Sequence, residues 1–235
     1  MTILVITGTG TEVGKTVTTA AVAAAAVAAG RSVAVLKPAQ TGVGPHERGD
    51  ADEVARLAGV TTLELGRYPE PLAPATAARR ARLAPVRPRE VAEAAAKLAT
   101  EHDLVLIEGA GGLLVRFDDE GGTLADVATL LDAPVLLVVA AGLGTLNTTE
   151  LTAREIRRRG LDLAGLVIGS WPDSADLASR CNLADLPVVA EAPLLGALPA
   201  GAGARPPAEF RAGAPGWLAP ALGGTWDADT FAGSC

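Results

Sequence analysis

The residues best suited to chemistry lie in one short stretch near the amino terminus. Gly14-Lys15-Thr16 follows two further glycines, Gly8 and Gly10. An apolar, β-branched run precedes this stretch (residues 3–6), and an alanine-rich helical run follows it (residues 17–29). Strand, glycine-rich loop and helix are the context of a phosphate-binding loop. Loop N–H groups and the positive end of the helix dipole would hold an anion, Lys15 would reach the β- and γ-phosphates, and Thr16 would bind Mg²⁺.

The spacing of this loop departs from the usual pattern by one residue. The usual pattern places the first glycine five residues before the glycine of Gly-Lys-Ser/Thr. Here that position holds Thr9, and Gly8 comes one residue earlier. We therefore expect a loop with one extra residue; the alternative is a tight β-to-α turn with a capping threonine.

Three more candidates follow strand-like or turn-like runs. Glu108 comes directly after four apolar residues, where a carboxylate could hold Mg²⁺ or cap a loop. Asp50 is a second metal candidate or a plain helix N-cap, and Asp52 is its rival. Lys37 follows another apolar run and stands before Pro38. With Lys15 it would place two ammonium groups on one anionic centre, which suits phosphoryl transfer, unless it is a solvated surface lysine.

A fourth candidate is the start of a later helix. The run Gly144-Thr145-Leu146-Asn147 opens a helix that extends to Arg159. Its free N–H groups could hold a substrate carboxylate. Simple capping by Thr145 or Asn147 explains the same residues.

Alternating buried strands and helices must position these side chains. Apolar runs at residues 3–6, 32–36, 104–107, 134–139, 163–168 and 194–198 read as strands, with helices at 17–29, 50–58, 89–100, 124–131 and 145–159. A short strand is expected at 113–117, and an irregular connection at 66–88. This pattern predicts a single-domain α/β fold of the P-loop NTPase type, with a doubly wound, mostly parallel sheet flanked by helices. Ligands then bind at the carboxyl ends of the strands, where the candidates fall.

Composition sets further limits. The 235 residues are 49% hydrophobic and only 3% aromatic, so alanine, valine and leucine must build the core. A net charge of −7 argues against a general nucleic-acid binder, and no apolar run is long enough to span a membrane. Cys181 and Cys235 show no metal-site spacing, which favours a reduced, cytoplasmic compartment. We expect a nucleotide-binding domain over residues 1–200 and a Gly/Pro/Ala-rich tail, partly packed on it, over 201–235.

Several motifs together resemble one family, the dethiobiotin synthetases. The lengthened loop 7–16, the run Lys37-Pro38 followed by Gln40-Thr41-Gly42, and the strand end 108–112 are similar to its signatures. Residues 143–147 and 193–199 resemble two later ones. The match covers about residues 1–200, and the extra loop residue is itself a family trait.

The resemblance implies a ligase of biotin biosynthesis. Such enzymes use ATP, Mg²⁺ and CO₂ (or bicarbonate) to close the ureido ring of dethiobiotin on 7,8-diaminopelargonate, through a carbamate and a carbamic–phosphoric anhydride. It also implies a homodimer in which the tail carboxylate of the substrate is held by the partner subunit.

The resemblance assigns roles residue by residue. It implies that the catalytic residues are Lys15, Lys37 and Thr11. The expected Mg²⁺ ligands are Thr16, Asp50 and Glu108. The expected substrate-binding residues are Thr11, Lys37, Thr41, Gly111, Gly144, Leu146 and Asn147. The expected nucleotide-binding residues are Gly10, Thr11, Glu12, Val13, Gly14, Lys15, Thr16, Val17, Gly169, Ser170, Pro199 and Ala200.

The chain departs from the family pattern at two places. Gly10 stands where the family often has Asp, and Gly169-Ser170 aligns with an Asn-Asp pair that reads the nucleobase. Since glycine has no side chain to read a base, we expect a loose nucleobase preference.

Three other classes compete with the ligase. Partitioning and metal-pump ATPases with a deviant phosphate loop carry an early lysine where this chain has Gly10, and the absence of that lysine argues against this class. A cobyrinate-type amidotransferase needs an additional glutaminase domain, for which the 235 residues leave no length. A degenerate nucleotide-binding regulatory module is the non-enzymatic alternative, and the presence of Lys15, Thr16, Lys37 and Glu108 argues against it.

Overall fold

A parallel sheet forms the centre of the molecule. The computed structural model describes residues 3–233, so Cys235 lies outside the described residues. Within that range seven strands pair in the order β3-β2-β4-β1-β5-β6-β7, every pair parallel. They are β1 (Ile3–Gly8), β2 (Val33–Thr41), β3 (Thr61–Tyr68), β4 (Leu104–Gly112), β5 (Val135–Val139), β6 (Leu163–Trp171) and β7 (Leu194–Pro199). This arrangement confirms the doubly wound α/β fold expected from the alternating apolar runs.

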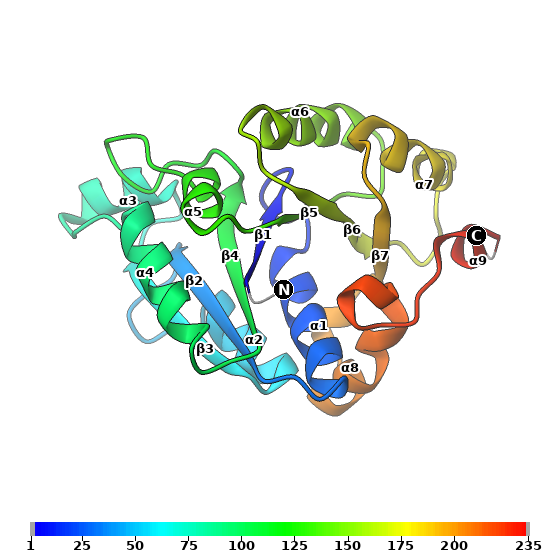
Figure 1. The fold of residues 1–235 in the computed structure, drawn as a ribbon, viewed down its shortest axis with the longest axis horizontal. Helices are drawn as coiled ribbons and strands as arrows, with labels where there is room; N and C mark the ends of the chain where they lie inside the picture. Colours follow the sequence, from blue (N-terminus) through cyan, green and yellow to red (C-terminus); the bar gives the residue numbers. More distant parts are fainter. Residues whose placement is uncertain (1–2, 234–235) are drawn as a thin grey trace.

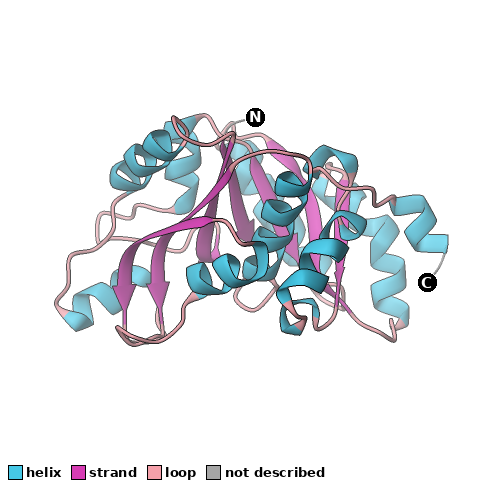
Figure 2. Ribbon diagram, turned by 90° about the horizontal axis from the view of Figure 1, so that it is seen from below, coloured by secondary structure: helices cyan, strands magenta, loops and turns pink. Residues whose placement is uncertain are grey.

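Helices cover both faces of the sheet (Figures 1 and 2). One face carries α1 (Lys15–Ala28), α2 (Asp50–Ala58) and α8 (Pro207–Gly213). The other carries α4 (Pro88–Leu98), α5 (Leu124–Leu131), α6 (Thr145–Arg158) and α7 (Leu177–Ala190). The helix α3 (Pro74–Ala81) packs on Ala39 and Tyr68. None of the helices in residues 3–233 is long and apolar enough to cross a membrane.

Alanine allows α1 to lie close to the sheet. Its residues 20–26 are all buried, six of these seven being alanine. Small side chains shorten the distance between helix axis and strands, and aliphatic strand residues fill the space between them. The core therefore needs few aromatic side chains, as the composition indicates.

The structure corrects three expectations. Residues 66–88 are only partly irregular, because they include the end of the edge strand β3 and all of α3. The strand expected at 113–117 is a turn with one antiparallel bridge, Arg116 to Thr123. Residues 37–41 and 169–171 continue β2 and β6 rather than leaving them as loops. In the first and third cases, pairing with a neighbouring strand outweighs the local signals of proline, glycine and polar residues.

The carboxyl-terminal segment is ordered against the sheet and α1. It contains α8, three short 3₁₀ helices (Ala202–Ala204, Ala214–Trp217 and Pro220–Leu222) and α9 (Ala228–Gly233). Phe210 and Leu218 are fully buried, and the Phe210 ring meets that of Trp217 edge to face at 5.3 Å between centroids. The tail residues therefore complete the core on the α1 face.

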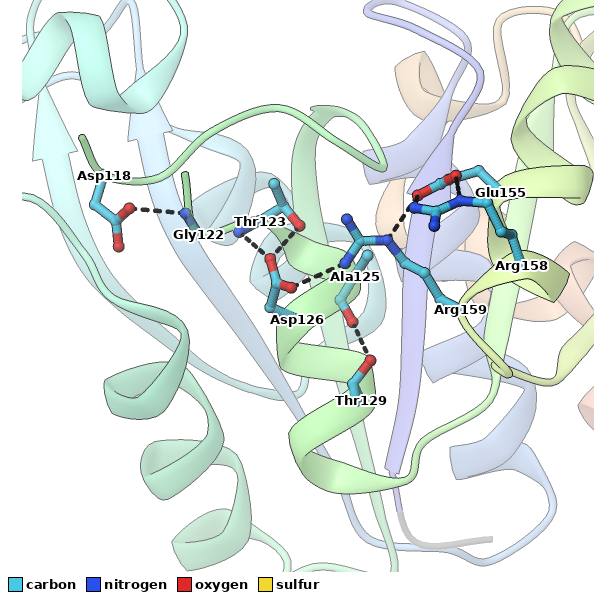
Figure 3. Close-up of polar contacts among 9 residues, drawn as sticks. All are labelled: Asp118, Gly122, Thr123, Ala125, Asp126, Thr129, Glu155, Arg158 and Arg159. Atoms are coloured by element: carbon cyan, nitrogen blue, oxygen red, sulfur yellow. Dashed lines mark hydrogen bonds and ion pairs between the residues drawn. The ribbon is translucent and has the colours of Figure 1, made fainter. Parts of the chain in front are cut away.

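A polar network fastens α5 to the end of α6 (Figure 3). The Thr123 amide and hydroxyl both donate to Asp126 Oδ2, at 2.8 and 2.6 Å, which caps the start of α5. Arg159, just after α6, donates to Asp126 Oδ1 at 2.9 Å and to Glu155. Hydrogen bonds from Arg158 and Arg159 lower the pKa of Glu155 to about 2. This network holds the two helices that flank the central strands in a fixed relation.

Candidate functional site

A cavity of about 760 Å³ opens at the carboxyl ends of β1, β2 and β4. Most of the expected catalytic and metal residues line it: Thr11, Glu12, Gly14, Lys15, Thr16, Val17, Lys37, Thr41, Asp50 and Gly111. Glu108 lies beneath them and is 1% exposed. The parallel sheet thus brings residues from four separate stretches of the sequence to one edge.

The phosphate loop, residues 9–14, joins β1 to α1. Its first amide, that of Thr9, donates to Val138 of β5 at 3.0 Å. A side chain on Gly8 would require the loop to shift, because a Cβ there would lie 2.7 Å from Val13 Cγ2 and 3.1 Å from the Gly10 carbonyl oxygen. Lys15 is the first residue of α1, and its ammonium donates to the Gly10 carbonyl at 2.7 Å. The loop amides and the helix terminus therefore face the cavity as an anion site.

The end of β6 supports this loop from below. Gly14 caps α1 with φ of 93°, a left-handed conformation that favours glycine. A Cβ on Gly169 would lie 2.1 Å from the Val13 carbonyl oxygen, and a Cβ on Gly14 would lie 2.5 Å from the Gly169 carbonyl oxygen. The absent side chain at position 169 is therefore a requirement of backbone contact. By contrast, a Cβ on Gly10 would meet nothing within 4 Å.

The Lys37 cluster, made of Thr16, Lys37, Asp50 and Glu108, lies next to the loop. The Lys37 ammonium is 2.9 Å from Glu108 Oε1 and 2.5 Å from Asp50 Oδ2, and it donates to the Gly109 carbonyl at 3.2 Å. The Thr16 hydroxyl donates to the same Glu108 oxygen at 2.8 Å. Lys37 is 2% exposed, so the alternative of a solvated surface lysine is wrong.

The pKa values of Lys37 and Lys15 are shifted in opposite directions. Burial acts to lower the pKa of Lys37, but the charges and hydrogen bonds of Glu108 and Asp50 outweigh it, and the pKa is raised above the usual value. For Lys15, burial and repulsion by Lys37 outweigh the attraction of the two carboxylates, and the pKa is lowered. Lys37 is thus held as a cation, and its positive charge contributes to the lowered pKa of Lys15.

The structure separates Asp50 from Asp52. Asp52 Oδ2 accepts the Gly49 amide at 2.8 Å and completes the capping box of α2, so its carboxylate serves the helix. Asp50 is the first residue of α2, and its carboxylate reaches Lys37. Gly49, not Asp50, is the N-cap. Of the two carboxylates, Asp50 alone joins the cluster.

Sequence reasoning missed several residues of the cavity. Gln40, 6% exposed, accepts the Asp50 amide on Oε1 at 2.7 Å and donates to the Thr41 carbonyl at 3.1 Å, so it orients the start of α2. The cavity is also lined by Pro71, Leu72, Ala73, Pro74, Ala110 and Val115. Gln40 and Ala110 lie within the family signatures but carried no assigned role, and the clustering of prolines after β3 is equally typical of a plain loop.

Two groups of expected site residues lie outside this cavity. Gly144, Leu146 and Asn147 are at the amino end of α6, after β5, where Leu143 is 93% exposed. Gly169, Ser170, Pro199 and Ala200 are at the ends of β6 and β7, where the Ala200 amide donates to the Trp171 carbonyl at 2.7 Å. In the first group, Gly144 and Asn147 are exposed and Leu146 is half-buried against the core. In the second group, Gly169 contacts Gly14 of the phosphate loop.

The cluster contains hard oxygen donors of the type that bind small divalent cations. The Thr16 hydroxyl and the Asp50 and Glu108 carboxylates all converge around the Lys37 ammonium. No group of three or more His, Cys, Asp or Glu side chains that could hold a metal occurs among residues 3–233. A hydroxyl and two carboxylates beside a phosphate loop suit an ion that also takes ligands from substrate phosphates.

The sheet order, the loop and the cluster define the chain as a P-loop NTPase by fold. The septum-site protein MinD of Pyrococcus horikoshii, a solved structure, is similar over 89% of this chain and 88% of its own, with a TM-score of 0.57 and 18% identity. That likeness concerns the fold alone. The family model described as an AAA domain matches residues 2–205.

Sequence relatives give the family. The chain is 84% identical over 233 residues to the ATP-dependent dethiobiotin synthetase of Streptomyces avermitilis, covering 99% of this chain and 98% of that one. It is 78% identical over 232 residues to the protein of the same name from Streptomyces coelicolor, covering 98% of each. The chain therefore belongs to the family of ATP-dependent dethiobiotin synthetases.

The contact between Gly14 and Gly169 generates a prediction. Gly169→Ala should raise the dissociation constant for ATP at least tenfold, about 1.4 kcal/mol, because the new Cβ displaces the phosphate loop. Gly216→Ala is the control, since a Cβ there meets nothing within 4 Å. Titration calorimetry measures both variants; unchanged ATP binding in Gly169→Ala would contradict the packing argument.

Proposed function

We propose that this chain closes the ureido ring of dethiobiotin on 7,8-diaminopelargonate with CO₂ and ATP. Family membership supports the reaction class. The observation that carries the proposal is the Lys37 cluster, where a buried ammonium stands beside the phosphate-loop lysine at one end of the cavity. Two cations at one point suit a reaction that collects carbamate and phosphoryl oxygens there.

The proposed steps need no protein nucleophile. One substrate amine attacks CO₂, forming an N–C bond and losing a proton, to give a carbamate. A carbamate oxygen then attacks the γ-phosphorus, and ADP leaves. The second amine attacks the carbonyl carbon of the anhydride, phosphate leaves, and the ring closes. Positioning and charge stabilisation are sufficient for each step.

The residues of the cavity take separate parts in this scheme. Lys37 and Lys15 stabilise carbamate and phosphoryl oxygens, and Thr11, Thr41 and Gly111, which share the same cavity, hold the diamine end of the substrate. The residues that would hold Mg²⁺ are Thr16, Asp50 and Glu108. When bound, the ion supplies neutralisation of charge on the phosphate oxygens. The aliphatic wall at Pro71–Pro74 suits the hydrocarbon chain of the substrate.

The tail carboxylate of the substrate is proposed to bind at Gly144, Leu146 and Asn147 of a second subunit. These residues do not line the cavity of their own chain, and the Leu146 and Asn147 amides lie in the first turn of α6, where they have no intrahelical acceptor and could hold an anion. Leu143, just before α6, and Leu151, in the middle of α6, are exposed apolar side chains, 93% and 62% accessible, and they support burial of this helix in a homodimer. A reaction that consumes ATP fits a cytoplasmic location.

The alternatives make different predictions for nucleotide turnover. An ATPase of the deviant-loop class would release phosphate without the diamine, and a binding module would release none. For the ligase, phosphate release from ATP should require both diaminopelargonate and bicarbonate, and dethiobiotin should form in equal amount. A coupled phosphate assay, with omission of each substrate in turn, measures this. Release that is independent of the diamine would overturn the proposal.

The nucleobase preference should be loose. The Gly169 backbone packs under the phosphate loop, so no side chain at that position can read a base edge. We expect kcat/KM values for ATP, CTP and GTP that agree within tenfold, about 1.4 kcal/mol. Initial rates with each nucleotide at saturating diamine give these values. A preference for ATP well above tenfold would show that another group reads the adenine.

A further inference from the structure

A buried amide from α7 holds the loop that leads into α6. Asn182 is 5% exposed, and its Nδ2 group donates to the Ala141 carbonyl at 2.7 Å and to the Gly142 carbonyl at 3.1 Å. Both partners are acceptors, so the amide must present its NH₂ group to them. In Figure 1, α7 lies beside α6.

The two carbonyls occupy the point where β5 ends and α6 begins. Gly142 O also accepts the Thr145 amide at 3.3 Å, the first turn of the helix. Gly144 caps α6 with φ of 93°, and the Leu146 and Asn147 amides fall in the turn that has no intrahelical acceptor. Fixing the Gly142 peptide therefore fixes the direction in which these free N–H groups point.

The loop has little else to fix it on its outer side. Leu143 is 93% exposed and Gly144 is exposed, so neither is held by packing. From below, α7 supplies the support: Asp176 caps it by accepting the Ser179 amide at 2.7 Å, and buried Ser179 and Asn182 face the loop. Burying an amide is unfavourable unless it is hydrogen-bonded, and here both donors are used.

We infer that Asn182 is a positioning residue for the carboxylate site at the amino end of α6. It touches neither substrate nor nucleotide and acts through the Ala141 and Gly142 carbonyls, which aim the helix N–H groups at the tail of the substrate. This inference rests on the proposed function. A positioning role predicts that substitution of Asn182 impairs only substrates that carry the tail carboxylate. A purely structural role predicts equal losses with and without it.

The test compares two diamines in the full-length enzyme. Asn182→Leu keeps the number and branching of the side-chain heavy atoms and removes both donors. We expect KM for 7,8-diaminopelargonate to rise at least tenfold, with kcat and the KM for ATP within twofold of wild type. With 2,3-diaminononane, which has the same vicinal diamine and chain but no carboxylate, wild type and variant should have equal kcat/KM within twofold.

Two further variants separate positioning from folding. Leu186→Ala creates a cavity one turn further along the same face of α7, where Leu186 is 0% exposed, and should leave the ratio between the two diamines unchanged. Asn182→Ala should repeat the carboxylate-specific loss, and thermal unfolding shows which variants are folded. Equal losses with both diamines, or an unchanged KM, would overturn the inference while leaving the proposed function intact. A wild-type enzyme inactive with diaminopelargonate would instead overturn the proposed function, and the inference with it.

Discussion

The buried Lys37 ammonium is the constraint on which the site depends. Removing one ion from water costs several kcal/mol, and attraction to a partner offsets this only when the geometry is good. Here the sheet provides the geometry. Leu36 of β2 pairs with Ile107 of β4, so the next residues of both strands, Lys37 and Glu108, come side by side at the carboxyl edge. The register of β2 and β4 therefore places the two charges of this buried ion pair next to each other.

The surrounding elements complete this pair rather than forming separate sites. The capping box of Asp52 and the amide contact of Gln40 place the first residue of α2 so that the Asp50 carboxylate reaches the same ammonium. Thr16, in the first turn of α1, bonds to the carboxylate that Lys37 also contacts. The phosphate loop is in turn supported by the end of β6 through the contact between Gly14 and Gly169. The residues proposed to bind nucleotide, cation and substrate therefore surround the same buried ion pair.

The central strands and the phosphate loop could be predicted because their signals are local. Continuous apolar runs mark β1, β4 and β5, and Gly14-Lys15-Thr16 marks the loop. The edge strand β3 could not be predicted, because its polar, alternating sequence is a strand only through its pairing with β2. Asp50 and Asp52 are equivalent in sequence, and only the capping contact of Asp52 distinguishes them. Asn182 gave no signal either, since its two acceptors lie 40 and 41 residues away.

The most direct test of this account is the effect of Lys37→Gln on ring closure and on nucleotide binding, measured in the same preparation. The variant removes the cation but keeps a hydrogen-bond donor, so we expect ring closure to slow at least a hundredfold, the scale seen when one group that stabilises developing charge is lost. ATP binding by calorimetry should stay within a few-fold of wild type, because the phosphate loop and Lys15 are untouched. A near-normal rate of dethiobiotin formation by Lys37→Gln would contradict the account.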